Sequence, residues 1–257
     1  ADRHSTHGDH RTQGYRLHKE AIHAQIEKAI GNPIFYVDVI TNAAGDICAV
    51  FAGHSPEINE PAWTEAERMF QVKTSQADVL IMGIPGAAVY GSTDNPLLAM
   101  TYITTPPRTW LGKPLIRKGG VVIALGCSSG VCDIDSRPSD PEVMERYQRC
   151  FRASELSQYI EEFLTRPDYL YRYQHCYAYH PIHAFWLLYE NQWLVEHANK
   201  VIMAGDVNPG PLRSLGLMPS RSFAEAWQMA GEVVGQSPRV AVLPHYWSHL
   251  KMQFVVE

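Results

Sequence analysis

The sequence predicts an α/β fold in which a mostly parallel sheet with flanking helices follows a helix and a β-hairpin. Four short runs rich in Val, Ile and Leu occur between residues 79 and 244, and such runs suit strands buried on both faces of a parallel sheet. Helical patterns separate these runs, and the repeated order of strand and helix is typical of α/β proteins. The first part of the chain differs, because one helical pattern is followed by two β-rich runs.

The N-terminal part of the chain contains the predicted helix and hairpin. A His-rich polar arm leads into a helical pattern over residues 18–31, in which apolar residues recur at helical spacing and Gly31 gives a stop. The runs "IFYVDVIT" and "DICAVFAG" flank the turn formers "NAAG" and predict an antiparallel hairpin. We assign residues 1–66 to the remnant of a partly missing N-terminal domain and residues 67–257 to a C-terminal α/β domain, with the boundary near residues 54–76.

The C-terminal part carries the strands of the predicted sheet and the loops that follow them. The strand runs are 79–85, 121–127, 201–207 and 240–244, and helical patterns span 141–150, 153–164, 181–200 and 222–234. The runs end in the loop sequences "GIPGAAVYGSTDNP", "GCSSGVCD", "GDVNPGP" and "PHYWSH". In open α/β sheets ligands bind outside the carboxyl ends of the strands, so these loops are the predicted location of a functional site.

Composition excludes several classes of protein. The formal net charge of −5 and the lack of a basic stripe argue against a nucleic-acid binder. Five cysteines without a CxxC pair are typical of a reduced, cytoplasmic protein. No apolar run approaches the ~20 residues that cross a bilayer, and the polar N-terminus lacks the apolar centre of a signal peptide. The chain begins at Ala1 without an initiator Met, which leaves processing or truncation open.

The loop after the first strand run is the first candidate ligand site. It matches neither the dinucleotide fingerprint nor the phosphate-binding loop of nucleoside triphosphatases. We interpret it as a turn-rich loop that offers polar groups to a small ligand: Tyr90, Ser92, Thr93, Asp94 and Asn95. The alternative is that its Ser, Thr, Asp and Asn residues cap the next helix.

Cysteines and histidines offer further candidates. Cys127 and Cys132 follow the second run, but without a nearby His we favour partly buried cysteines over a nucleophile or a metal pair. His245 and His249 follow the last run, and a surface cluster is the favoured interpretation.

The stretch "HCYAYHPIHAFWLLY", residues 175–189, brings three histidines together with aromatic residues. Pro181 suits the first position of a helix, which makes His180 its cap and puts His183 in the first turn. The positive end of the helix dipole there favours a neutral imidazole. Three interpretations stay open: a contact to a carboxylate-bearing substrate, a pair of metal ligands at i, i+3 spacing, or hydrogen-bonded histidines on a packed aromatic helix.

Several segments of the chain resemble the lactate racemase family. They are "HRTQGYRLHKEAIHAQIEKAI…FYVDVITNAAGDICAVFAGH", "ADVLIMGIPGAAVYGSTDNPLLA" and "IRKGGVVIALGCSSG", while "YAYHPIHAFWLLY…VIMAGDVNPGPLRSLGL" looks like a divergent branch. The resemblance covers nearly the whole chain but only the second half of a family member. It implies two α/β domains with the active site between them, and a nickel-pincer nucleotide attached to a lysine of the first domain. It also implies hydride transfer at the α-carbon of a 2-hydroxy acid, with first-domain histidines as acid–base groups.

The sequence departs from the family pattern at the cofactor and at the substrate. The segment that bears the cofactor lysine is absent, and His4 is the nearest match to the nickel-binding histidine. Ala99 and Tyr102 stand where lactate racemases place a Gln and a Lys that contact the substrate, which argues against lactate itself. Arg11 matches a family arginine that we interpret as structural. No catalytic or metal-ligating residue is therefore assigned.

Two hypotheses follow for the function. The first is the C-terminal part of a 2-hydroxy-acid racemase or epimerase, with a substrate larger than lactate and a missing N-terminal domain that holds the nickel-pincer nucleotide. We then expect this chain alone to bind no such cofactor. The substrate-contact residues expected on this hypothesis are Tyr90, Ser92, Asp94, Asn95, Tyr102, His180 and His183. The second hypothesis is a non-catalytic small-molecule-binding or assembly module of the same fold. Homo-oligomerisation stays open under both, and a nucleotide-dependent oxidoreductase is a third, weaker interpretation.

Overall fold

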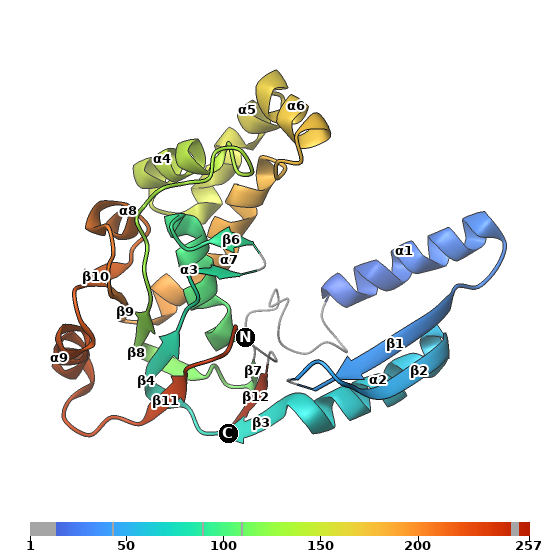
Figure 1. Ribbon diagram of the computed structural model, residues 1–257, viewed down its shortest axis with the longest axis horizontal. Helices are drawn as coiled ribbons and strands as arrows, with labels where there is room; N and C mark the ends of the chain where they lie inside the picture. The colour runs from blue at the N-terminus through green and yellow to red at the C-terminus, as the bar shows by residue number, and fades with distance from the viewer. Residues whose placement is uncertain (1–13, 43, 89, 109, 248–251) are drawn as a thin grey trace. The chain divides into compact units, whose positions relative to one another are not determined.

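The helix expected near the start of the chain is α1, Gly14–Ile30, in the computed structural model (Figure 1). The structure describes residues 14–42, 44–88, 90–108, 110–247 and 252–257. Gly31 follows α1 at φ +73°, a left-handed conformation that glycine adopts without steric cost. The predicted hairpin is confirmed as β1, Phe35–Thr41, paired antiparallel with β2, Ile47–His54.

Helix α2, Ser55–Phe70, occupies the stretch in which the sequence suggested a domain boundary, so residue 66 falls inside a helix. Pro56 lies in its first turn, where a backbone N–H has no helical partner, and a proline there favours a helix start over a loop. Ile58 and Ala62 are buried on this helix, which packs against β1 and β2.

A small parallel sheet joins three strands from distant parts of the sequence. Its spatial order is β3, Gln71–Thr74, then β12, Gln253–Val256, then β7, Trp110–Gly112. The sequence did not predict β7 and β12, because three or four residues carry too little periodicity to be recognised.

The chain divides into two compact units. The first consists of Ala1–Gln76, Arg108–Leu115 and Tyr246–Glu257, and the second of Ala77–Pro107 and Ile116–His245. The hairpin, α1, α2 and the three-stranded sheet thus belong to the first unit, which takes in two later segments of the chain as well as its N-terminal part.

The second unit is built on a parallel sheet with the order β10-β9-β8-β4-β11 among the described residues. Its strands are β4, Ala77–Gly83, β8, Ile116–Leu125, β9, Lys200–Ala204, β10, Met218–Ser220, and β11, Val240–Leu243. Every pair in this sheet is parallel, and all four predicted strand runs lie in it. The predicted α/β fold, a mostly parallel sheet with flanking helices preceded by a helix and a hairpin, is confirmed. The edge strand β10 was missed because "MPS" contains a proline, which weakens any strand prediction.

Helices of the second unit alternate with these strands. They are α3, Pro96–Thr104, α4, Asp140–Cys150, α5, Ile160–Leu164, α6, Pro167–His175, α7, Ile182–His197, α8, Pro209–Ser214, and α9, Phe223–Val234. Two 3₁₀ helices span Pro106–Arg108 and Ala153–Tyr159, and β5, Ala87–Ala88, pairs with β6, Gly91–Ser92. The prediction of one helix over 153–164 was wrong in its first half, where the Ser157 hydroxyl donates to the Ser154 carbonyl and competes with α-helical bonding.

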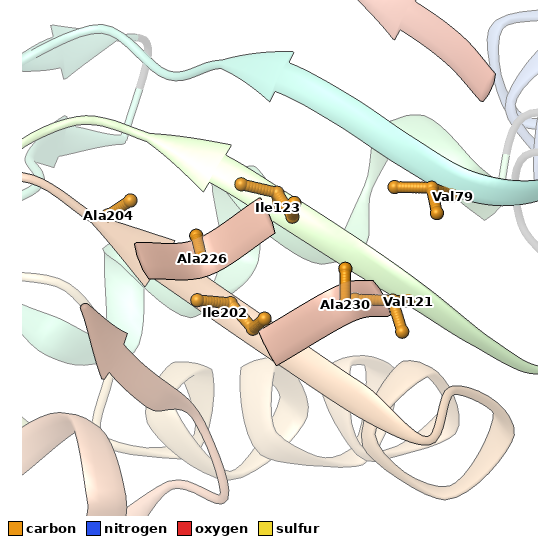
Figure 2. Close-up of a cluster of buried hydrophobic side chains, with 7 residues drawn as sticks. All are labelled: Val79, Val121, Ile123, Ile202, Ala204, Ala226 and Ala230. Carbon is orange, nitrogen blue, oxygen red and sulfur yellow. The ribbon is translucent and has the colours of Figure 1, made fainter. Parts of the chain in front are cut away.

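The core of the second unit lies on both faces of the sheet. Figure 2 shows Ala226 and Ala230 of α9 beside Val121, Ile123 and Ile202 of the central strands. Small residues at i, i+4 spacing let this helix approach the sheet closely. The alternate residues of β4 and β8 are equally buried and face the other way, where α7 contacts β8 and β9. None of the helices in the described ranges is long and apolar enough to cross a membrane.

Candidate functional site

Three loops meet where the central strands of the second unit end. The loop after β8 exchanges backbone hydrogen bonds with the loop after β9, because Ser128 N–H donates to Asp206 O and Asn208 N–H donates to Ser128 O. The same loop bonds to the loop after β4, since Gly130 N–H donates to Asp94 O and the Thr93 hydroxyl donates to Cys127 O. Loops fixed in this way present a rigid surface at the carboxyl edge of the sheet, where the sequence predicted a site.

Two glycines allow these loops to approach one another. Gly205 has φ +143°, and a Cβ there would lie 2.1 Å from the carbonyl oxygen of Gly126. A Cβ on Gly126 would in turn lie 2.4 Å from the Ile84 side chain. Only glycine fits either position, so these residues set the spacing of the loops.

A pocket of about 220 Å³ opens between the loops after β4 and β8. We call it the loop pocket. It is lined by Tyr90, Gly91, Ser92, Asp94, Asn95, Leu98, Val131, Cys132, Asp133, Ser136 and Arg137. Four of the residues predicted to contact a substrate, Tyr90, Ser92, Asp94 and Asn95, are therefore brought together here.

The polar side chains of this pocket also hold its walls. Hydrogen bonds from Ser129 and Ser92 keep the pKa of Asp94 below its usual range, so this carboxylate is ionised at neutral pH. Asn95 caps α3, because its side-chain oxygen accepts from Leu97 N–H. The capping alternative is thus realised at Asn95, which also donates to Asp140 at 2.7 Å.

Tyr102 lies beneath the loop and not in the pocket. Its side chain is fully buried on α3, and its hydroxyl donates to Gly91 O while accepting from Tyr90 N–H. Ala99, on the same helix, is also fully buried. In this structure Tyr102 therefore positions the loop that carries Tyr90 and Ser92.

Arg137 is the central residue that the sequence interpretation missed. Its side chain is 1% exposed and lines the loop pocket. Nε and Nη2 donate to Tyr90 O at 3.2 and 2.9 Å, and Nη1 donates to His183 Nδ1 at 3.1 Å. The guanidinium also lies 3.9 Å from the Tyr179 ring centroid, a cation–π distance. Arg137 is the one basic residue between Lys118 and Arg146, but nothing in this stretch of the sequence indicates that its side chain is buried.

Asp140 balances the charge of Arg137 from a buried position. Its carboxylate oxygen lies 3.9 Å from Arg137 Nη1, beyond hydrogen-bond distance. Burial raises the pKa of Asp140 to about 6, although Arg137 and Asn95 both oppose this rise. Below that pH Asp140 becomes neutral and the guanidinium keeps an uncompensated positive charge.

His183 is held in one protonation state by Arg137. A guanidinium can only donate hydrogen bonds, so His183 Nδ1 accepts and the ring hydrogen lies on Nε2. Burial and the charge of Arg137 lower the pKa of His183 to about 4, which keeps the ring neutral at physiological pH. The sequence prediction of a neutral imidazole agrees with this, though its main causes are burial and a cation. With one nitrogen accepting and the other protonated, His183 is a hydrogen-bond donor and a poor metal ligand.

A second pocket of about 420 Å³ lies beside the start of α7. We call it the aromatic pocket. It is lined by Tyr173, Tyr177, Ala178, Tyr179, His180, Ile182, His183 and Trp186. His180 and His183 are thus separated from the other predicted residues, but the contact between Arg137 and His183 links the two pockets.

Aromatic rings form most of this second pocket. The His183 ring lies 4.8 Å from that of Tyr179 and 5.6 Å from that of Trp186, measured between centroids. His180 Nδ1 accepts from Ile182 N–H, but the N-cap of α7 is Pro181 and the helix begins at Ile182, so the prediction that His180 is the cap was wrong by one residue. Tyr177 is 99% exposed and has φ +57°, an uncommon conformation for a bulky residue.

Cys132, one of the remaining candidates, also lines the loop pocket. Burial raises the pKa of the Cys132 thiol to about 12, so it is a weak nucleophile, as the favoured interpretation of partly buried cysteines implies. Cys127 is exposed. His4, Arg11 and His249 lie outside the described residues.

Comparison with solved structures places this architecture among known folds. The lactate racemase apoprotein from Thermoanaerobacterium thermosaccharolyticum matches with a TM-score of 0.53 and 16% identity, over 95% of this chain and 50% of that one. A structural genomics target from Thermotoga maritima matches with a TM-score of 0.50 and 11% identity, over 96% of this chain and 54% of that one. The chain has a lactate racemase-like fold. It spans about half the length of both proteins, and at these identities the likeness shows the fold alone.

Sequence comparisons add no family assignment. No family model matches this chain, and no curated protein matches it either.

The donor groups of the described residues do not form a complete nickel site. Within the described ranges, no three His, Cys, Asp or Glu side chains come together in a set that could hold a metal ion. His183 is unsuited to ligation because its Nδ1 accepts from Arg137. We therefore derive no chemical step through a nickel-pincer nucleotide on the described residues.

Proposed function

We propose that this chain is the substrate-side part of a 2-hydroxy-acid racemase or epimerase, and that residues outside it hold the nickel-pincer nucleotide. The observation that carries the proposal is the lactate racemase-like fold, which extends over 95% of the chain. The buried pair Arg137 and His183 supports it, because the pair supplies fixed donors beside two pockets.

The proposed role of the chain is to bind and orient the substrate. His183 Nε2–H donates to a substrate oxygen, and its neutral ring takes no part in proton transfer. Asp94 and Asp133 line the loop pocket as carboxylates with a lowered pKa, so they accept from hydroxyl groups. Together with Arg137 they favour a ligand with several hydroxyl groups over a simple anion. This is the basis for proposing a hydroxy acid larger than lactate.

The experiment uses the protein at its natural length. Calorimetric titration with lactate and with a six-carbon sugar acid, gluconate, measures binding, and chromatographic separation of the C2 epimers measures turnover. We expect His183→Gln to weaken gluconate binding about tenfold. Nickel content, measured with intact mass, should stay unchanged in this variant, since His183 is not a ligand in the proposal. His175→Gln is the matched control, because His175 is exposed at the end of α6 and lines neither pocket.

Loss of nickel in His183→Gln would contradict the proposal and restore the metal-ligand interpretation. Stoichiometric nickel or racemisation in the isolated 257-residue chain would also contradict it.

A non-catalytic binding module is the second candidate. The observation that favours it is the burial of Ala99 and Tyr102, which stand where the family resemblance places substrate contacts. Gluconate binding by the nickel-loaded, natural-length protein without formation of the C2 epimer would establish this module. Formation of the epimer would exclude it.

A further inference from the structure

The outer face of the hairpin in the first unit is apolar and exposed. Phe35, Val37, Val39 and Val50 expose between 46% and 65% of their surface. Val37 pairs with Ala52 and Val39 with Val50, so these side chains lie on one face of the two strands. The other face packs against α2 and contains the buried Ile40. A soluble protein rarely leaves such a contiguous apolar face uncovered.

Helix α1 turns its polar side inward. Tyr36 of β1 meets His23 at 3.0 Å, Glu27 accepts from Ile34 N–H, and the Arg16 guanidinium lies 3.5 Å from the Trp63 ring centroid. Its apolar stripe, by contrast, is exposed: Ile22, Ile26 and Ile30 follow at i, i+4 spacing and expose 43–55% of their surface. Because Tyr36 lies on the face of β1 opposite Phe35 and Val37, α1 is on the α2 side of the hairpin, and its exposed stripe is a surface separate from the apolar hairpin face.

The hairpin also has open edges. Within the described ranges, β1 and β2 pair only with each other. A two-stranded hairpin is marginally stable in water, and its unpaired backbone groups accept a further strand.

We infer that the exposed face of β1 and β2 is a docking surface for an α/β polypeptide that completes the lactate racemase-like fold. The inference rests on the proposed function, since it names where the other part of that enzyme binds. The occupant is specified by the comparison, because this chain spans 50% of the racemase apoprotein and the rest of that protein is unmatched. An apolar face beside free strand edges suits such a partner.

Cys48 offers a reporter already present on this surface. It lies in β2 two residues from Val50, on the same face of the strand, and it is exposed. Cys127 and Cys176 are also exposed and belong to the second unit, so they serve as internal controls. The rate of alkylation by iodoacetamide at each cysteine is measured by peptide mass spectrometry.

The test compares the protein purified at its natural length with the 257-residue chain. We expect Cys48 to be alkylated at least tenfold more slowly in the natural protein, relative to Cys176, and at a rate similar to Cys176 in the short chain. Equal relative rates in the two preparations would overturn the inference. Protection of Cys48 in a particle whose mass equals two 257-residue chains would also overturn it, because a second copy would then be the occupant.

A charged side chain introduced on the exposed hairpin face provides a second test. Val50→Lys should lower the Tm of the natural protein by several degrees and should restore the alkylation of Cys48, while leaving the far-ultraviolet circular dichroism of the short chain unchanged. Val242→Lys is the matched control, because Val50 and Val242 are both 57% exposed strand residues and Val242 lies on β11 of the second unit. Equal effects of the two substitutions on the natural protein would contradict the inference. Neither measurement involves a hydroxy acid, so failure of the docking surface and failure of the proposed function are distinguishable.

Discussion

Arg137 is a fully buried cation that donates to a backbone carbonyl and a histidine and lies 3.9 Å from the buried carboxylate of Asp140. Removing it leaves Asp140 buried without this neighbouring positive charge, with a hydrogen bond from Asn95. We predict that Arg137→Met lowers the free energy of unfolding by about 3–5 kcal/mol, measured by urea denaturation.

The matched control for this substitution is Arg172→Met. Arg172 donates to Ile134 O at an exposed site, so we expect its loss to cost about 0.5 kcal/mol. The Arg137→Met, Asp140→Asn double variant should recover part of the loss, because no buried charge remains. Equal stability of the two single variants would show that Arg137 does not organise the site.

His183 gives the protein a pH dependence of defined sign. Its pKa falls from 6.5 to about 4 on folding, so as the pH drops through this window the unfolded chain binds the proton first and stability decreases. Asp140 acts in the opposite direction, since its raised pKa lets the folded state bind a proton first below about pH 6.

Comparing His183→Gln with the unmodified protein isolates the histidine contribution, because Asp140 is common to both. We predict that the unmodified chain loses roughly 1–3 kcal/mol relative to the variant between pH 7 and pH 4.5, measured by urea denaturation. Parallel stability curves over this range would contradict the assignment of a neutral His183.

Single residues were the least predictable level of this molecule. Sequence reasoning identified Tyr90, Ser92, Asp94 and Asn95 because polar residues after a buried strand lie at the ligand-binding edge of a sheet. It did not find Arg137, since nothing in "DIDSRPSD" shows that the arginine folds back under the preceding loop. Contacts of that kind depend on how loops pack and leave no periodic trace in the sequence.

At the scale of elements, the spacing of strands β8 and β9 depends on a glycine. Gly205→Ala would place a methyl group 2.1 Å from Gly126 O in a backbone conformation that L-residues rarely adopt. We predict a loss of roughly 2–4 kcal/mol in the free energy of unfolding. Thermal denaturation followed by circular dichroism measures it.

Gly231→Ala serves as the control for this prediction. Gly231 lies inside α9, and a Cβ there meets nothing within 4 Å. Because alanine is the better helix former, this variant should gain about 0.5–1 kcal/mol. If Gly205→Ala were as stable as the unmodified protein, the prediction would be wrong, because the loops would then move apart enough to accommodate the added methyl group.

Element prediction succeeded where the hydrophobic pattern was long and local. Runs such as "VLIMG" and "VVIAL" identified β4 and β8, and "NAAG" between β-rich runs identified the hairpin. It failed for β7 and β12, whose three or four residues become strands through partners far away in the sequence. Such strands are set by tertiary pairing, which local propensity does not encode.

For the whole molecule, the two compact units should differ in local stability. The central strands β4 and β8 are buried on both faces and paired on both edges, whereas α1 is held mainly by a few polar contacts. We predict that native-state hydrogen exchange of the 257-residue chain is slowest in β4 and β8 and fastest, among regular elements, in α1. Equal protection of α1 and β8 would contradict this ranking.

The fold class was predictable at this scale because strand and helix alternate along most of the chain. The segments that make up the first unit were not predictable from the sequence. Arg108–Leu115 lies between the two segments of the second unit, and Tyr246–Glu257 follows the second of them, yet both belong to the first unit. A single boundary between two continuous stretches of sequence cannot describe a unit that contains three separate segments of the chain.

The bonding among the three loops has a consequence for evolution and for engineering. Asp94 and Asp206 each accept from the loop that contains Ser128 and Gly130, so a change in one loop alters the support of the other two. Positions in these loops should covary among descendants of a common ancestor. Transplanting a new specificity from a relative therefore calls for all three loops as a set, with Gly126 and Gly205 retained beneath them.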